Sequence, residues 1–331
     1  MDLITLNSSG LSCVVVPELG GKIVSLLMKE KQCELVAVPT RPLFPADEEP
    51  PSFGRHGIAG LDDCFPNIDA EAIEFTAEEL SVPGYKEQCS RRLSYPDHGE
   101  IWSRKMRIAE QSADALKLVY DSGAFGYHYE KMYKLCGDQL RLHWEITNTG
   151  AQALPCIWTF HGLMRFEKDS ELVYPTDIRR FQLVYQLPGP GEMNRMVEYS
   201  VSAGPDPAAR NESPDADQDL QGGTPTLDRF PQGDTPSCLK FYTPEQVKDG
   251  RCSVIHPSDG VRVNISYDAD KLPWLGVWID DNVYGKCRNF AFEMTNGYFD
   301  KVSRAKANGK LCILAPGEKL AFQVTIEGEE I

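Results

Sequence analysis

The chain has 331 residues, of which 41% are hydrophobic and 10% aromatic, and its formal net charge is -15 at pH 7. This composition supports a sizeable core and excludes an intrinsically disordered chain. An acidic chain lacks the basic footprint that nucleic acids and anionic membranes require, so neither is expected as a partner. A small molecule fits the charge better.

The N-terminal residues show neither a basic n-region nor a sustained apolar stretch, and no run approaches the length of a membrane span. The ten cysteines are scattered without a Cys-x-x-Cys pair, which indicates reduced thiols and gives almost no support for a zinc site. We therefore expect a cytoplasmic globular protein without a metal or cofactor. The oligomeric state cannot be read from these features.

Short apolar runs separated by turn signals predict β-strands from the N-terminus onward, beginning with residues 11–16 and 23–27. Residues 40–54 carry four prolines and residues 55–67 are polar and glycine-rich, so both are predicted as loops. The second loop is a suitable place for ligand contacts. Further strands are predicted at residues 105–108, 116–120, 127–135, 140–147 and 154–166.

Composition changes between residues 187 and 237, which hold eight of the 23 prolines with many Gly, Asp and Ser residues. We predict a long excursion there with little regular structure. Strands resume at residues 254–256, 261–267, 274–279, 290–294, 311–314 and 320–326. Helical periodicity of convincing length is absent, so we expect one antiparallel all-β domain spanning residues 1–331.

The strand at residues 290–294 carries the carboxylate that is most suggestive of chemistry. Alternation places Phe290, Phe292 and Met294 on one face and Ala291 and Glu293 on the other. A lone carboxylate on a polar face is most commonly solvated, and is otherwise placed for chemistry.

Two of the six histidines could work with this carboxylate. His98 follows a Pro-Asp turn at a strand entrance, and His161 lies on one face of the strand at 154–166. A carboxylate and a histidine together suffice for acid and base work near neutral pH. Opening a cyclic aldose needs a base at the C1 hydroxyl and an acid at the ring oxygen, and reclosure on the other face gives the other anomer. Trp158 and Trp278 could supply apolar platforms for the sugar.

Competing motifs are weak. The sequence has no Gly-x-Ser-x-Gly, Walker A or His-Glu-x-x-His motif. Asp62 and Asp63 could form a two-carboxylate glycosidase site with Glu293 if their separation fits. Adjacent aspartates in a loop more often cap turns or face solvent.

Several segments occur in a characteristic order, including Pro-Asp-His-Gly-Glu-Ile-Trp at 96–102 and Phe-Ala-Phe-Glu-Met-Thr-Asn-Gly at 290–297. With them, the chain resembles the aldose 1-epimerase family of the galactose mutarotase-like superfamily. The resemblance implies a large antiparallel β-sandwich whose concave face binds carbohydrate. It also implies Glu293 as the base at the anomeric hydroxyl, His161 as the acid at the ring oxygen and His98 as a second histidine beside it. The other segments are 14–26, 140–150, 158–166, 272–278 and 314–318.

The chain departs from the family's usual pattern at two places. It reads Gly-Leu-Asp-Asp-Cys-Phe-Pro-Asn at 60–67 where an Asn-Arg pair is usual, and His-Gly-Leu-Met-Arg-Phe at 161–166 where His-Pro-Tyr-Phe-Asn is usual. We expect substrate contacts from Asp62, Asp63, Arg55, Trp158 and Trp278. Asp280 and Asp281 are further candidates for the family's sugar-binding aspartate.

Three functions fit these residues. The first is a mutarotase-like isomerase acting on a free aldose. The second is a phosphosugar (hexose-6-phosphate) 1-epimerase, which would need a basic cluster from Arg55, Arg165 or Arg288. The third is a carbohydrate-binding or sensing protein without turnover, because a fold alone does not specify an activity.

Overall fold

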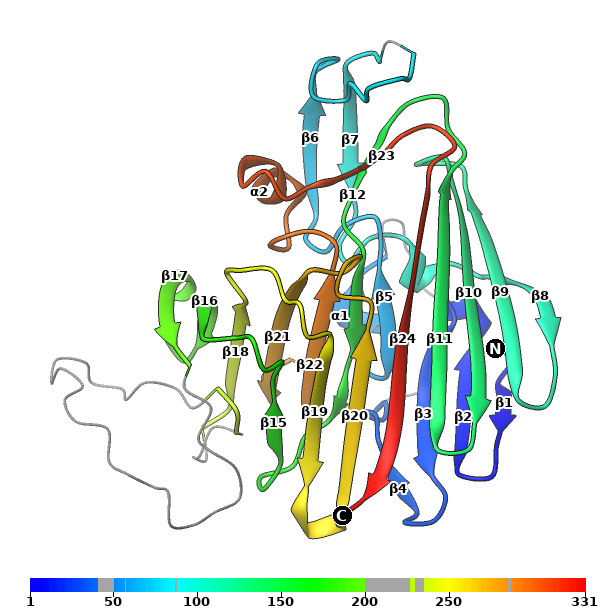
Figure 1. Ribbon diagram of the computed structural model, residues 1–331, viewed down its shortest axis with the longest axis vertical. Coiled ribbons are helices and arrows are strands. Elements are labelled where there is room, and N and C mark those ends of the chain that lie inside the picture. The colour runs from blue at the N-terminus through cyan, green and yellow to red at the C-terminus, as the bar shows by residue number, and fades with distance from the viewer. Residues whose placement is uncertain (41–50, 57, 87, 200–226, 230–234, 285–286) are drawn as a thin grey trace, which may run out of the picture.

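The computed structural model describes residues 1–40, 51–56, 58–86, 88–199, 227–229, 235–284 and 287–331. Two large sheets contain most of its regular structure, and their arrangement is drawn in Figure 1. All strand pairings in both sheets are antiparallel among these residues. The prediction of an antiparallel all-β fold is confirmed.

The larger sheet has 12 strands and carries the candidate site. Its order is β1 (Ile4–Asn7), β2 (Leu11–Val16), β3 (Lys22–Met28), β5 (Leu61–Cys64), β13 (Thr159–Gly162), β22 (Arg288–Thr295), β21 (Trp274–Asp281), β18 (Ser237–Tyr242), β16 (Arg180–Leu187) and β17 (Gly191–Glu198). Two short strands pair beside this path, β4 (Cys33–Glu34) with β3 and β14 (Met164–Arg165) with β22.

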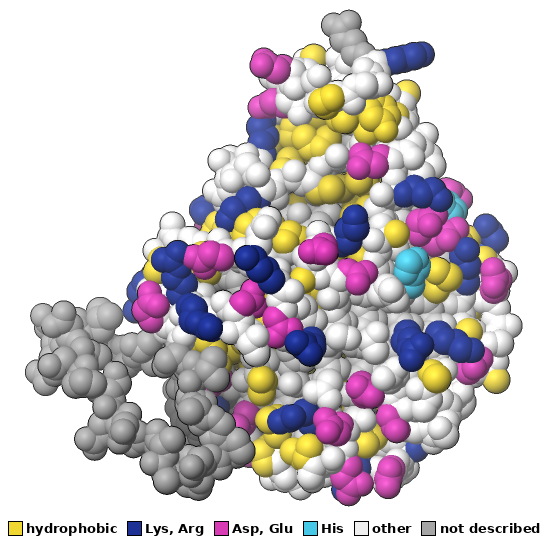
Figure 2. Space-filling view, in the orientation of Figure 1, with side chains coloured by type: hydrophobic (Ala, Val, Ile, Leu, Met, Phe, Trp, Pro, Cys, Tyr) yellow, Lys and Arg dark blue, Asp and Glu magenta, His cyan; other side chains and the backbone are white. Residues whose placement is uncertain are grey.

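The second sheet has eight strands and packs against the first. Its order is β15 (Glu171–Val173), β19 (Arg251–His256), β20 (Val261–Tyr267), β24 (Lys319–Glu330), β11 (Gln139–Asn148), β10 (Tyr127–Cys136), β9 (Ala115–Ser122) and β8 (Arg107–Gln111). Charged side chains of both signs are interspersed over the face of the molecule on which this sheet lies (Figure 2), as expected for the outward positions of a half-buried antiparallel sheet.

Two small sheets and one of the helices lie at one end of the two large sheets (Figure 1). Two-stranded sheets are formed by β6 (Glu71–Phe75) with β7 (Arg91–Tyr95), and by β12 (Leu154–Cys156) with β23 (Cys312–Leu314). The helices are α1 (Phe53–His56) and α2 (Val302–Ala307), and short 3₁₀ turns span Pro17–Leu19, Ile101–Ser103 and Pro257–Asp259. No helix within the described residues has the length and apolarity needed to cross a membrane.

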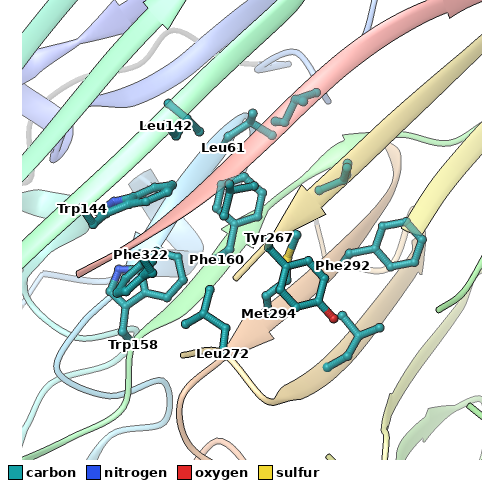
Figure 3. Close-up of a cluster of buried hydrophobic side chains, with 14 of the residues drawn as sticks. Leu61, Leu142, Trp144, Trp158, Phe160, Tyr267, Leu272, Phe292, Met294 and Phe322 are labelled. Atoms are coloured by element: carbon teal, nitrogen blue, oxygen red, sulfur yellow. The ribbon is translucent and has the colours of Figure 1, made fainter. Parts of the chain in front are cut away.

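The main core lies between the two large sheets. Phe160 from the larger sheet lies 6.2 Å from Trp144 of the smaller one between ring centroids, and Phe292 and Phe322 belong to the same cluster (Figure 3). The alternation predicted for residues 140–147 holds, since every second side chain from Leu140 is buried. The face of the 12-stranded sheet that meets this core is mainly apolar, so most polar side chains at alternate positions face the other way.

The loop prediction for residues 55–67 is wrong, because Leu61–Cys64 forms β5 in the interior of the larger sheet. All four of its residues are buried, including Asp62 and Asp63. The two carboxylates made this strand look like a solvated loop, whereas each is paired with a buried lysine from another strand.

The expectation of little regular structure at residues 187–237 is wrong for the first part of that segment. Gly191–Glu198 forms β17, which pairs with β16 at the edge of the larger sheet. Residues 200–226 and 230–234 lie outside the described part of the chain.

Candidate active site

A cavity of about 740 Å³ lies on the face of the 12-stranded sheet that points away from the main core. Glu293, His161, His98 and Trp278 all line it. Glu293 lies on β22, and His161 and Trp278 lie on the neighbouring strands β13 and β21. His98 lies on a loop. The fold therefore collects them at one place.

Strand register explains why Glu293 and His161 lie together. Glu293 pairs with Gly276 of β21. Antiparallel pairing of β13 and β14 with β22 runs through Thr159 opposite Thr295 and Met164 opposite Phe290. Continuing that register places His161 opposite Glu293, on the same face of the sheet.

Gly276 makes room for the Glu293 carboxylate. A Cβ atom at this position would lie 3.1 Å from Glu293 Oε2 and 2.8 Å from the Tyr242 ring. Both distances are shorter than ordinary van der Waals contact, so a larger residue would displace the carboxylate or the ring.

Glu293 is 1% exposed and forms an ion pair with Lys240 of β18. Lys240 Nζ lies 2.9 Å from Glu293 Oε2 and 2.8 Å from Asp300 Oδ1. Burial raises the pKa of Glu293 above its ordinary value, although the charge of Lys240 opposes this shift. A carboxylate with a raised pKa is suited to act as a base near neutral pH.

The two histidine rings lie 5.1 Å apart between centroids, nearly perpendicular to each other. The ring of Phe53 stacks on His98 at 3.8 Å and meets His161 edge-on at 5.2 Å. His98 has a φ of 58°, in the left-handed region, and its Nδ1 lies 2.8 Å from Asp97 Oδ1. Phe53 and Asp97 thus fix the orientation of the His98 ring.

His161 is 6% exposed, and burial lowers its pKa well below the ordinary value. The nearby charges of His98 and Lys240 act in the same direction. His161 is consequently a neutral imidazole at neutral pH. Its Nδ1 is buried and has no hydrogen-bond partner in the part of the chain that the structure describes.

An aromatic group forms another part of the lining. Trp278 of β21 lies beside Tyr185 of β16, with ring centroids 6.5 Å apart and an interplanar angle of 23°. Tyr284 meets Trp278 at 5.5 Å and hydrogen-bonds the Tyr185 hydroxyl through its own, with an O–O distance of 2.5 Å. These rings offer an apolar surface to the cavity.

Asp62 and Asp63 do not line the cavity, contrary to the sequence-based expectation. Asp62 lies opposite His161 in the sheet but is turned to Lys22, with Oδ2 2.8 Å from Nζ. Asp63 points to the opposite face and joins the two large sheets through Lys131 of β10 at 2.8 Å. Both carboxylates are buried ion-pair partners, so neither is available for a substrate.

Trp158 is also misplaced by sequence reasoning. It is fully buried in the main core, where it packs against Trp144 at 4.9 Å and its Nε1 donates to the Tyr129 hydroxyl at 2.9 Å. Trp158 lies three residues before His161, and alternation along an extended chain places residues three apart on opposite faces.

The arginines proposed for a phosphate lie elsewhere. Arg55 is exposed on α1 and does not belong to the cavity lining. Arg165 is paired with Asp259, and Arg288 with Asp281 at 3.2 Å. Neither of these contributes to the lining.

Sequence reasoning missed Lys240, Asp300 and Phe53, all of which line the cavity. Lys240 had a detectable signal, because it is a single cation in the apolar run Cys-Leu-Lys-Phe-Tyr at 238–242. Asp280 does line the cavity, and accepts a hydrogen bond from the Val283 N–H at 2.9 Å. The described residues contain no group of three or more His, Cys, Asp or Glu side chains arranged to hold a metal ion.

Comparison with known proteins gives fold-level matches along the whole chain. A candidate aldose 1-epimerase from Escherichia coli K12 has a TM-score of 0.66 and 17% identity, with 100% of this chain and 99% of that one covered. A galactose mutarotase-like protein from Clostridium acetobutylicum has a TM-score of 0.66 and 14% identity, with 99% and 95% covered. The chain has the galactose mutarotase-like fold. This confirms the fold that the ordered segments implied.

Sequence matches are shorter. The uncharacterized protein YphB of Escherichia coli K12 is 27% identical over 106 residues, which is 30% of this chain and 36% of that protein. The match therefore spans about a third of that curated relative. No protein-family model matches the chain.

Proposed function

We propose that this protein is an aldose 1-epimerase-like isomerase that interconverts the α and β anomers of a sugar by opening and reclosing its ring. The observation that carries the proposal is the buried Glu293 carboxylate beside His161 in the lining of one cavity. The galactose mutarotase-like fold of the chain and the family resemblance of its segments support the same activity.

In this mechanism, Glu293 accepts the proton of the C1 hydroxyl while the bond between C1 and the ring oxygen breaks. The electrons of the O–H bond form the carbonyl, and the ring oxygen takes a proton from the histidine side of the cavity. Rotation about the C1–C2 bond and attack of the new hydroxyl on the other carbonyl face give the other anomer. During reclosure the attacking hydroxyl returns its proton to His161, and Glu293 returns its proton to O1.

The two histidines have different parts in this proposal. His161 lies buried opposite Glu293 and acts as the acid once it has taken up a proton. Its imidazolium donates a hydrogen bond to the ring oxygen, transfers that proton as the bond breaks and becomes the neutral imidazole that burial favours. His98 lies beside it and is held by Asp97 at 2.8 Å, so that it can replace the proton. A positioned acid or base of this kind contributes about 10²–10⁴-fold to a rate.

The test is NMR saturation exchange between anomers, over a panel of free and phosphorylated aldoses. The proposal expects at least one sugar to exchange faster with the protein than without it. Binding without faster exchange for every sugar would instead identify a carbohydrate-binding protein. If no sugar binds and none exchanges faster, both the isomerase and the carbohydrate-binding function are contradicted.

Replacing Trp278 by Ala should weaken sugar binding by about tenfold to a hundredfold, because stacking of an apolar sugar face on an aromatic ring would be lost. The measurement is the dissociation constant of the best substrate by isothermal titration calorimetry. Trp278→Phe should recover part of the affinity. Unchanged affinity in Trp278→Ala would show that the sugar does not contact this ring.

A phosphorylated or carboxylated aldose is the second candidate substrate. Lys301 and Arg304 line the cavity, and neither is paired with a carboxylate among the described residues. The guanidinium of Arg304 lies over the Phe299 ring, 5.5 Å from its centroid. Cations at a cavity edge are able to receive an anionic group.

For a phosphosugar substrate, Arg304→Ala should lower kcat/KM by at least about tenfold and leave the free sugar nearly unaffected. The control is Arg165→Ala, outside the cavity. Equal losses for both forms of the sugar would contradict a phosphate contact at Arg304.

A further inference from the structure

Lys240 is a buried cation at the centre of the candidate site. It is 8% exposed and lies on β18, opposite Trp278 of the neighbouring strand. Its ammonium group lies 2.9 Å from Glu293 Oε2 and 2.8 Å from Asp300 Oδ1. Asp300 is itself held, since the Tyr242 hydroxyl donates a hydrogen bond to the same Oδ1 atom.

Burying an ammonium group costs several kcal/mol unless opposite charges and hydrogen bonds compensate it. Burial opposes the charge of Lys240, yet Asp300 and Glu293 together hold its pKa above the ordinary value. Lys240 therefore stays protonated. It acts as a fixed positive charge and not as a nucleophile.

The ion pair makes the two oxygens of Glu293 different. Both oxygens are buried without a hydrogen-bond partner among the residues that the structure describes, but only Oε2 has an ion-pair contact, 2.9 Å from Lys240 Nζ. A buried carboxylate oxygen without a partner is costly, so a ligand hydroxyl donating to Oε1 would be stabilised. Gly276 leaves room on the Oε2 side of the carboxylate, where a Cβ atom would lie 3.1 Å from Oε2.

We propose that Lys240, anchored by Asp300, is the positioning residue that fixes the Glu293 carboxylate and leaves Oε1 as the proton acceptor. This inference rests on the proposed function. Lys240 contacts Glu293, and Asp300 contacts Lys240. Both act through Glu293 and not on the reacting atoms.

The charged and titratable groups around Glu293 come from several elements. Lys240 and Tyr242 lie on β18, and His161 lies on β13. His98 acts on Glu293 from the loop before residues 101–103, and Asp300 acts on Glu293 from the loop after β22. Asp69 is next to Asp300, because the Asp69 backbone N–H donates a hydrogen bond to the Asp300 carbonyl at 3.0 Å.

The two partners act on Glu293 with opposite signs. Removing the positive charge of Lys240 should raise the pKa of Glu293 further, because burial and Asp300 then act unopposed. Removing the negative charge of Asp300 should lower the pKa of Glu293, because Lys240 then forms an ion pair with Glu293 only. A role that is only structural would not shift the pKa in opposite directions.

The experiment compares Lys240→Met, Lys240→Arg and Asp300→Asn by anomer exchange from pH 4 to 9. Lys240→Met should lose at least about tenfold at pH 7 and recover as the pH rises, since one pKa unit is tenfold in the ionised fraction. Asp300→Asn should move the acidic limb to lower pH. Lys240→Arg should stay within about fivefold of the wild type, because it retains the charge.

The control is Lys117→Met, which removes a lysine 2.9 Å from Glu130 on the other sheet. It should leave the pH profile unchanged. An acidic limb that stays in place in both Lys240→Met and Asp300→Asn would overturn the proposal. If Lys240→Met does not fold, the shift expected in Asp300→Asn decides.

A second readout does not need turnover. The side-chain carboxyl of Glu293 can be titrated by ¹³C NMR, with its signal assigned by its loss in Glu293→Gln. If the wild type does not exchange anomers, the proposed function fails, and this titration alone decides on Lys240. A higher midpoint in Lys240→Met than in the wild type supports the pairing role, and an unchanged midpoint overturns it.

Discussion

Replacing Glu293 by Gln is expected to reduce catalysed anomer exchange by about 10²–10⁴-fold. The amide has nearly the same shape as the carboxylate, and cannot accept the C1 hydroxyl proton at neutral pH. Because Glu293 is 1% exposed, solvent has little access to replace it as a base. NMR saturation exchange at saturating sugar measures the loss as a fall in kcat.

The matched control for Glu293→Gln is Glu130→Gln. Glu130 is also a strand glutamate, with Oε2 2.9 Å from a lysine, and it lies on β10 of the other sheet. Its substitution should leave the exchange rate within about twofold. Exchange at the wild-type rate in Glu293→Gln would mean that another group is the base.

Replacing Lys131 by Met is expected to lower the free energy of unfolding by about 3–5 kcal/mol, the usual cost of leaving a buried charge without its partner. Lys131 is fully buried and its Nζ lies 2.8 Å from Asp63 Oδ2. The same oxygen accepts hydrogen bonds from the Tyr129 hydroxyl at 3.1 Å and from Trp144 Nε1 at 3.0 Å. Chemical denaturation followed by tryptophan fluorescence gives the change.

A control for this loss lies three residues along the same strand. Lys134 is half exposed and pairs with Asp114 on the surface, so Lys134→Met should cost less than about 1 kcal/mol. Adding Asp63→Leu to Lys131→Met should restore part of the stability, because no unpaired buried charge remains. Equal costs for the two lysine variants would contradict a structural role for the buried pair.

Glu293 shows how far local pattern can reach. Alternation along residues 290–294 predicted which side chains enter the core, and the structure buries Phe290, Phe292 and Met294 in the main cluster. Ala291 belongs to a separate cluster on the other face, beside Trp278. The side of the sheet on which Glu293 lies was therefore predictable, because two residues per repeat is a property of any strand.

Local pattern failed where a charge was buried. The charges of Asp62 and Asp63 hid β5, because the sequence alone gave no sign of Lys22 and Lys131 as their partners. A carboxylate remains in a core only when its opposite charge arrives from elsewhere in the chain. Asp63 was expected in the substrate site for the same reason, because its partner Lys131 could not be identified from the sequence.

The all-β class, the alternation of the main strands and the candidate trio of Glu293, His161 and His98 could be predicted from the amino-acid sequence. These features rest on local periodicity and on short segments that resemble a known family. Which side chains share the cavity depends on how the strands pair in three dimensions. Lys240 reaches Glu293 and Asp300 because β18 and β22 flank β21 in the sheet, and pairing between strands distant in sequence is not written in the periodicity of either one.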